Sequence, residues 1–206
     1  MENIICAKFK VESEAYQSMT ELKKTAVNSL FVISQAALVK NVNGKIIALD
    51  AFDTGAKTDD DTLTGGLIGG LIGVLGGPLG MLVGGSMGAL AGSAVDAHDA
   101  AVGVTMIEEV ADKMRDGEVA IIALVQEDAV EPLNAALAKF ETFTIRRDAA
   151  EVAEEIRQAK ELEAELEREA RKKLRAEKKE ERKAKVEEQK AKIKADFDAL
   201  KSKFKK

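Results

Sequence analysis

The chain has 206 residues, which is enough for one modest hydrophobic core and an appendage. Tryptophan is absent and only 4% of the residues are aromatic, so the aromatic belts typical of a conventional membrane-spanning protein are missing. The formal net charge of −5 is unevenly divided, because residues 1–148 carry −9 and residues 149–206 carry +4. The basic part is the one we expect to meet an anionic surface.

The residues typical of enzymes are scarce. The sequence has no Walker A loop, dinucleotide-binding glycine motif, nucleophile elbow, zinc-protease helix or paired-cysteine motif. Cys6 is the single cysteine, and its strand-like surroundings favour a buried structural role over a reactive thiol. His98 is the single histidine, which favours a solvated or capping role over a metal ligand or a base. We expect no enzyme activity, no catalytic residues, no cofactor and no metal site.

The first part of the chain predicts strand, helix, strand and strand. The run from Asn3 to Lys10 is typical of a strand, and an amphipathic helix follows with Ser13 as its expected N-cap. Two β-rich runs then flank Asn43-Gly44, which is a strong signal for a two-residue β-hairpin turn.

The stretch from Leu63 to Val95 differs from the rest of the chain. It contains no charged side chain and holds twelve of the sixteen glycines. Most of these glycines recur at four-residue steps, which places each set along one helical face. Such a face allows two helices to pack closely, so we expect helix packing at Gly65, Gly69, Gly73, Gly77, Gly80, Gly84, Gly88 and Gly92.

The glycine pattern predicts a helical hairpin with its turn at Gly76, Gly77 and Pro78. Its arms would reach roughly 20 and 25 Å, which is short of the ~30 Å hydrocarbon core of a bilayer. The apolar neighbours of the glycines, including Leu67 and Leu71, would face outward to lipid or to the apolar wall of a partner. A flexible linker is disfavoured because linkers are polar. Asp59, Asp60 and Asp61 precede the hairpin and favour helix capping over a calcium site.

The chain then returns to alternating helices and strands. A helix is expected from Asp96 to Met114, a buried strand over 118–127, a helix over 128–140 and a last strand over 143–146. The order indicates an α+β fold: a ferredoxin-like βαββ-αβαβ domain, residues 1–58 and 97–148, with helices on one face of an antiparallel sheet. The glycine-zipper hairpin, residues 59–96, is an insertion in this domain.

Residues 149–206 are composed almost entirely of charged and helix-forming residues without glycine or proline, which predicts a long charged helix or coiled coil. Leu162, Leu166 and Leu174 form a thin apolar stripe, but sustained heptads are lacking. We expect this helix to contact a protein partner, and nucleic-acid binding is disfavoured.

Several blocks resemble the DUF1269 family, whose members are often labelled predicted membrane proteins. The similar segments lie within residues 3–147 and read LVKNVNGKI, TLTGGLIGGLIG, GPLGMLVGGSMGALAGSAVDA and MRDGEVAIIALVQED. The resemblance implies a ferredoxin-like domain that carries a membrane-associating or self-associating hairpin. It implies no enzymatic activity.

The leading functional hypothesis is a non-enzymatic, membrane-associated and self-assembling scaffold or stress-type protein. The absence of a secretory signal pattern at the start favours termini in the cytoplasm. In this hypothesis the hairpin contacts lipid and a second copy of the chain, and the charged helix contacts a partner. One alternative is a soluble cytoplasmic homo-oligomer whose hairpins form a shared protein core. A second alternative is a small-ligand regulatory module.

Overall fold

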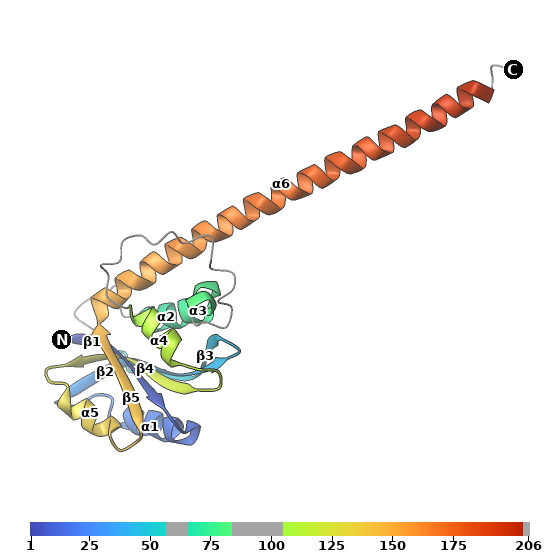
Figure 1. The fold of residues 1–206 in the computed structure, drawn as a ribbon. Helices are drawn as coiled ribbons and strands as arrows, with labels where there is room; N and C mark the ends of the chain where they lie inside the picture. The colour runs from blue at the N-terminus through green and yellow to red at the C-terminus, as the bar shows by residue number, and fades with distance from the viewer. Residues whose placement is uncertain (57–65, 84–104, 204–206) are drawn as a thin grey trace. The chain divides into compact units, whose positions relative to one another are not determined.

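The computed structural model describes residues 1–56, 66–83 and 105–203 (Figure 1). The chain divides into two compact units, Met1–Glu161 and Leu162–Lys206. The first unit is a mixed α+β domain, and the second unit belongs to the last helix of the chain.

A five-stranded antiparallel sheet forms the centre of the first unit, in the order β3-β2-β4-β1-β5. Its strands are β1 (Glu2–Phe9), β2 (Phe31–Val42), β3 (Lys45–Asp53), β4 (Val119–Glu127) and β5 (Thr142–Asp148). Strands β1 and β2 both pair with β4, so they run parallel to each other, and helix α1 (Glu12–Lys24) connects them. Strands β4 and β5 both pair with β1, so they also run parallel to each other, and helix α5 (Glu131–Leu137) connects them. The predicted order of strands and helices is confirmed.

The predicted hairpin turn between β2 and β3 is also confirmed. Asn43 and Gly44 have φ angles of 54° and 79°, as a turn with two left-handed residues requires. The Asn43 backbone N–H donates to Asp116 Oδ1 at 2.6 Å, and the buried Asn41 side chain donates to the Met114 carbonyl at 2.6 Å. These bonds fix the hairpin to the connection that precedes β4.

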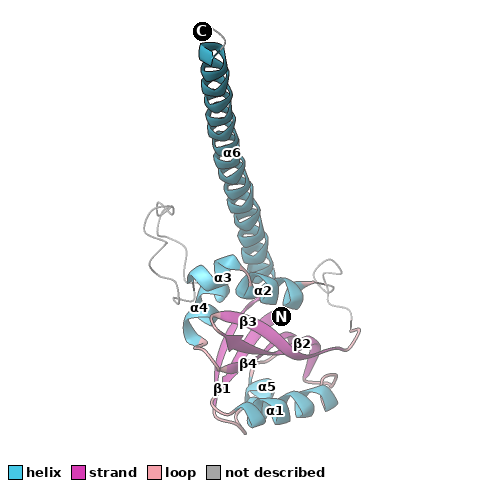
Figure 2. Cartoon of the chain, turned by 90° about the vertical axis from the view of Figure 1, so that its right-hand side faces the viewer, coloured by secondary structure: helices cyan, strands magenta, loops and turns pink. Residues whose placement is uncertain are grey.

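Helices α1 and α5 cover one face of the sheet (Figure 2). Met19 and Leu22 of α1 and Leu133 of α5 are buried against strand residues such as Ile121. The predicted N-cap at Ser13 is wrong, because α1 begins at Glu12 and its N-cap is Val11, without a side-chain capping bond. The earlier start places Glu12 in the first turn, where the helix dipole favours an acidic residue.

The opposite face of the sheet is covered as well, so the expectation of helices on one face only is wrong. Helix α2 (Leu67–Gly76), helix α4 (Met106–Lys113) and the start of helix α6 (Ala149–Lys203) pack over this face (Figure 2). The physical reason lies in β4, whose side chains are apolar toward both faces and almost all buried. A strand of this kind needs a helical layer on each side.

The start of α4 is capped by two carboxylates, those of Glu155 and Glu108. Glu155 of α6 accepts hydrogen bonds from the Met106 N–H at 2.9 Å and from the Ile107 N–H at 3.4 Å, and so caps the start of α4. Thr105 and Glu108 complete a capping box there. Helix α4 therefore begins at Met106, and residues 96–104 of the helix predicted from Asp96 lie outside the described residues.

The second unit, Leu162–Lys206, is described as helix from its start to Lys203, as the sequence predicts. Ion pairs at three- and four-residue spacing run along it, including Arg171 to Glu167 at 3.1 Å and Lys192 to Glu188 at 2.9 Å. Leu174 is 56% exposed and Val186 is 48% exposed, so these two apolar side chains are open to solvent.

Candidate functional site

Helix α2 has two chemically different sides. Its apolar side, which consists of Leu67, Ile68, Leu71, Val74 and Leu75, is at most 5% exposed and packs in the core layer over β2 and β4. The expectation that these residues face outward is therefore wrong. The sheet of the same chain already offers an apolar wall, and burying them there removes their apolar surface from water.

The glycine side of α2, which consists of Gly69 and Gly73, faces away from the sheet and is exposed. A Cβ atom built on either glycine would meet no other atom within 4 Å. Gly69 and Gly73 thus lie on one open helical side, where a neighbouring helix could approach closely.

Other glycines of the same block lie in close contact within the chain. A Cβ at Gly76 would sit 2.6 Å from the Ile46 carbonyl oxygen of β3, and one at Gly70 would sit 3.2 Å from Ile156 Cγ2 of α6. A Cβ at Gly80 would overlap the Leu75 carbonyl group. Only glycine allows the backbone to approach this closely at Gly76 and Gly80.

The predicted hairpin turn falls at a break between two helices. Helix α2 ends at Gly76 and helix α3 (Pro78–Val83) begins at Pro78, with Gly77 between them. Four of the predicted packing residues lie outside the described residues, namely Gly65, Gly84, Gly88 and Gly92. Among the described parts of the chain, no helix is long and apolar enough to cross a membrane.

An open groove of about 520 Å³ runs beside α2. Most of its lining residues are small or apolar, and Gln35 and Asp53 are the polar ones. The groove is lined by Gln35, Ala36, Ala37, Ala48, Ala51, Phe52, Asp53, Ile68, Gly69 and Ile72. The backbone N–H of Gly55 and the side chain of Gln35 donate to Asp53, and these bonds hold the pKa of its carboxyl below the usual value. The groove is suited to an apolar segment rather than to acid–base chemistry.

The groove adjoins an exposed edge of the sheet. Strand β3 pairs with β2 alone, and its Ile47 and Leu49 side chains are 41% and 36% exposed. The ladder between β2 and β3 shifts register between Leu38 and Val39. Exposed edge strands with apolar side chains are surfaces on which another chain can pair.

Cys6 lies in the core layer beneath α2 and α4 and is 1% exposed. Burial raises the pKa of its thiol to about 12, and the charge of Glu109 acts in the same direction. The thiol therefore stays protonated at neutral pH and is a poor nucleophile. His98 and the acidic run Asp59–Asp61 lie outside the described residues. Among the residues that the structure describes, no group of side chains could hold a metal ion.

A buried polar cluster at the end of β4 was not found from the sequence. The Glu127 side chain is fully buried, and Arg146 Nε of β5 lies 2.8 Å from its Oε1 atom. Asn3 of β1 donates to the same carboxylate at 3.0 Å, and Arg146 also donates to Asn134 at 3.0 Å. The one available signal was a glutamate at the end of a mainly apolar strand. These partners supply the hydrogen bonds that the buried carboxylate needs. The cluster therefore has a structural role, because it connects β4 with β1 and β5.

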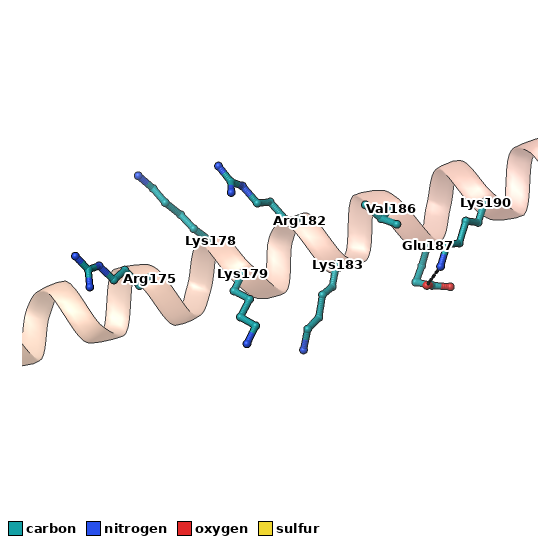
Figure 3. A pocket seen from close by; sticks show the side chains of 8 residues that line it. All are labelled: Arg175, Lys178, Lys179, Arg182, Lys183, Val186, Glu187 and Lys190. Carbon is teal, nitrogen blue, oxygen red and sulfur yellow. Dashed lines mark hydrogen bonds and ion pairs between the residues drawn. The ribbon is translucent and has the colours of Figure 1, made fainter.

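Basic side chains also line an open groove along helix α6, within the second unit (Figure 3). The lining residues are Arg175, Lys178, Lys179, Arg182, Lys183, Val186, Glu187 and Lys190. All of them come from one helix, so the feature is a charged surface and not an enclosed cavity.

Comparisons with known proteins give one family match. The family model described as a protein of unknown function, DUF1269, matches residues 62–159. Comparison with curated proteins and with solved structures gives no match. The family match begins later than the expected span of residues 3–147, and it ends within the first three turns of α6.

The matched region joins the elements that cover one face of the sheet. It contains α2, α4 and the start of α6, together with strands β4 and β5. The resemblance predicted from the sequence is confirmed over residues 62–159, the part of the chain that matches the DUF1269 family model.

Proposed function

We propose that this protein is a non-enzymatic scaffold that self-associates through the glycine side of α2 and the adjoining groove. The observation that carries the proposal is the open position of Gly69 and Gly73 beside an apolar groove. An interior helical glycine costs roughly 0.5–1 kcal/mol relative to alanine. Two exposed glycines in one short helix are therefore unfavourable unless close packing against another helix compensates.

The edge strand supports the same surface. Ala48 and Ala51 of β3 are exposed on the wall of the groove, and Ile72 of α2 is only partly buried beside them. A helix or strand from a second copy placed here would cover these apolar groups together with Gly69. Small side chains on both walls would allow its backbone to come close.

The topology supports the finer assignment of a ferredoxin-like domain. Two split βαβ units interlock in it, β1-α1-β2 around β4 and β4-α5-β5 around β1. In this assignment, β3 is an additional edge strand and α2 to α4 belong to the insertion. The insertion covers the sheet face that a two-layer fold of this class leaves open.

Membrane association through the insertion is a second candidate. The charge-free run from Leu63 to Val95 favours it, although the apolar side of α2 is already buried in the domain. Residues 84–95 of this run lie outside the described residues. We propose termini in the cytoplasm for both candidates.

The test is sedimentation velocity of the full-length protein and of the double variant Gly69→Leu/Gly73→Leu over a range of concentrations. Wild type should form oligomers, while the variant should remain folded and shift to monomer. Folding should persist because a Cβ at either position meets open space. A detergent series and vesicle flotation would show whether any large wild-type species is bound to lipid.

A matched control is Ser13→Leu/Gln17→Leu on α1. It adds two leucines at the same four-residue spacing, at exposed positions on the opposite face of the sheet. This control should associate like wild type. A wild-type protein that is monomeric at every concentration, or a glycine variant that associates unchanged, would contradict the proposal.

A further inference from the structure

The two units of the chain carry opposite charge. Residues 1–161 contain 14 Lys and Arg against 25 Asp and Glu, a net charge of −11, whereas residues 162–206 contain 17 against 11, a net charge of +6. A protein with a negative total charge can thus bind an anionic surface only through a local cluster of cations. The second unit is where such a cluster lies.

The cations of this unit are grouped on one side of α6. At 100° per residue, Arg175, Lys178, Lys179 and Arg182 fall within a sector of about 100°. All four side chains are exposed, and Figure 3 shows them reaching away from the helix along its length. We call these four residues the basic face. Glu188 falls outside this sector, and Glu181 lies beside it, about 60° from Lys178.

The ion pairs described along α6 do not include the basic face. Several other cations of α6 are paired with carboxylates, among them Arg171 with Glu167 and Lys190 with Glu187 at 3.2 Å. Within the described part of the helix, no ion pair joins a carboxylate to any of the four residues of the basic face. Their positive potential is available to an outside partner.

The same side of the helix continues into apolar residues. Val186 lies in the middle of the sector and is 48% exposed. In the sequence, the same helical positions are then occupied by Ile193, Phe197 and Leu200. Cations followed by aliphatic and aromatic residues on one side of a helix match the chemistry of a bilayer surface, where headgroups take the charges and the acyl boundary takes the apolar groups. A nucleic-acid backbone would use only the cations.

We propose that the basic face of α6 binds anionic lipid headgroups, so that this part of the helix lies on a membrane surface. The proposal does not depend on self-association through α2, and it differs from insertion of the apolar block. Binding by the basic face requires anionic lipid and weakens with salt. Binding by an inserted apolar segment would persist on neutral vesicles and in high salt.

The test is co-sedimentation of the full-length protein with vesicles of phosphatidylcholine, alone or mixed with phosphatidylserine, at low and high salt. Wild type should bind the mixed vesicles at low salt only. Arg175→Gln/Lys179→Gln/Arg182→Gln should weaken that binding by about a hundredfold, since each cation near an anionic surface contributes about fivefold. Circular dichroism checks that the helix remains formed.

The matched control is Lys173→Gln/Lys192→Gln/Lys194→Gln, which removes the same charge from positions about 90° or more from the middle of the basic face. It should weaken binding by less than about tenfold, because these cations lie outside the sector that faces the surface. Equal losses in the two triple variants would overturn the proposal, as would binding to neutral vesicles or no binding to anionic ones. Binding to a DNA duplex with no preference for vesicles would assign the face to nucleic acid instead.

Discussion

The apolar side and the glycine side of α2 have the same four-residue spacing and opposite surroundings. Leu71 and Leu75 are at most 1% exposed in the core, while Gly69 and Gly73 meet open space. A glycine repeat shows that close approach is possible along one side of a helix. It does not show that the apolar residues on the other side face lipid, because the sheet of the same domain can cover them.

The largest effect is expected on the apolar side. Leu71→Ala should lower the free energy of unfolding by about 2–5 kcal/mol, because the side chain is fully buried and its removal leaves a cavity. Chemical denaturation monitored by circular dichroism would measure it. The control Ile47→Ala changes a side chain that is 41% exposed and should cost much less. Equal, small effects would show that α2 does not pack on the sheet.

The pKa of Cys6 tests whether water is excluded from the core layer that the apolar side of α2 helps to form. Its pKa is raised from 9.0 to about 12 in the folded protein, chiefly by burial. Between these two pH values the unfolded chain loses the thiol proton while the folded chain keeps it. The free energy of unfolding should therefore fall by about 1.4 kcal/mol per pH unit above pH 9.

The variant Cys6→Ala isolates this contribution from the other groups that titrate at alkaline pH. The stability difference between wild type and Cys6→Ala should shift in favour of the variant as the pH rises from 9. If that difference stays constant with pH, water reaches the thiol and the layer is not closed.

Gly76 and Gly69 lie in the same helix and have opposite surroundings. Gly76→Ala should cost about 1–3 kcal/mol, because the added Cβ would lie 2.6 Å from the Ile46 carbonyl oxygen and force the helix away from β3. The cost would appear as a lower denaturation midpoint with an unchanged slope.

Gly69→Ala should have the smallest effect and the opposite sign. The added Cβ meets no atom, so the monomer should gain roughly 0.5–1 kcal/mol from the better helix propensity of alanine. The measurement is a denaturation curve at a concentration where the protein is monomeric. A loss of stability there would mean that this side of α2 is occupied within the chain.

Much of the fold could be predicted from local sequence patterns. Asn43-Gly44 favours a two-residue turn because both residues readily adopt positive φ angles. The segment after Asp148 consists of helix-forming residues without glycine or proline, which predicts a helix. The sequence predicts a buried strand over 118–127, and the two apolar faces of the observed strand β4 are the reason that helices cover both sides of the sheet.

The orientation of α2 could not be predicted in the same way. A helical repeat defines which residues share a side, but the choice of the side to be buried depends on the distant strands that meet it. The Glu127 and Arg146 pair depends in the same manner on contacts between residues 19 positions apart in the sequence. Neither the pairing nor its burial follows from the local sequence of β4.

Cysteine accessibility along α2 tests the central claim most directly. Single cysteines are introduced into the Cys6→Ala background as Gly69→Cys, Leu71→Cys, Gly73→Cys and Leu75→Cys, and the rate of thiol labelling is measured at several concentrations. Positions 71 and 75 should be protected at every concentration. Positions 69 and 73 should be labelled rapidly in the monomer and become protected on self-association. Rapid labelling at 71 and 75 with protection at 69 and 73 in the monomer would contradict this account.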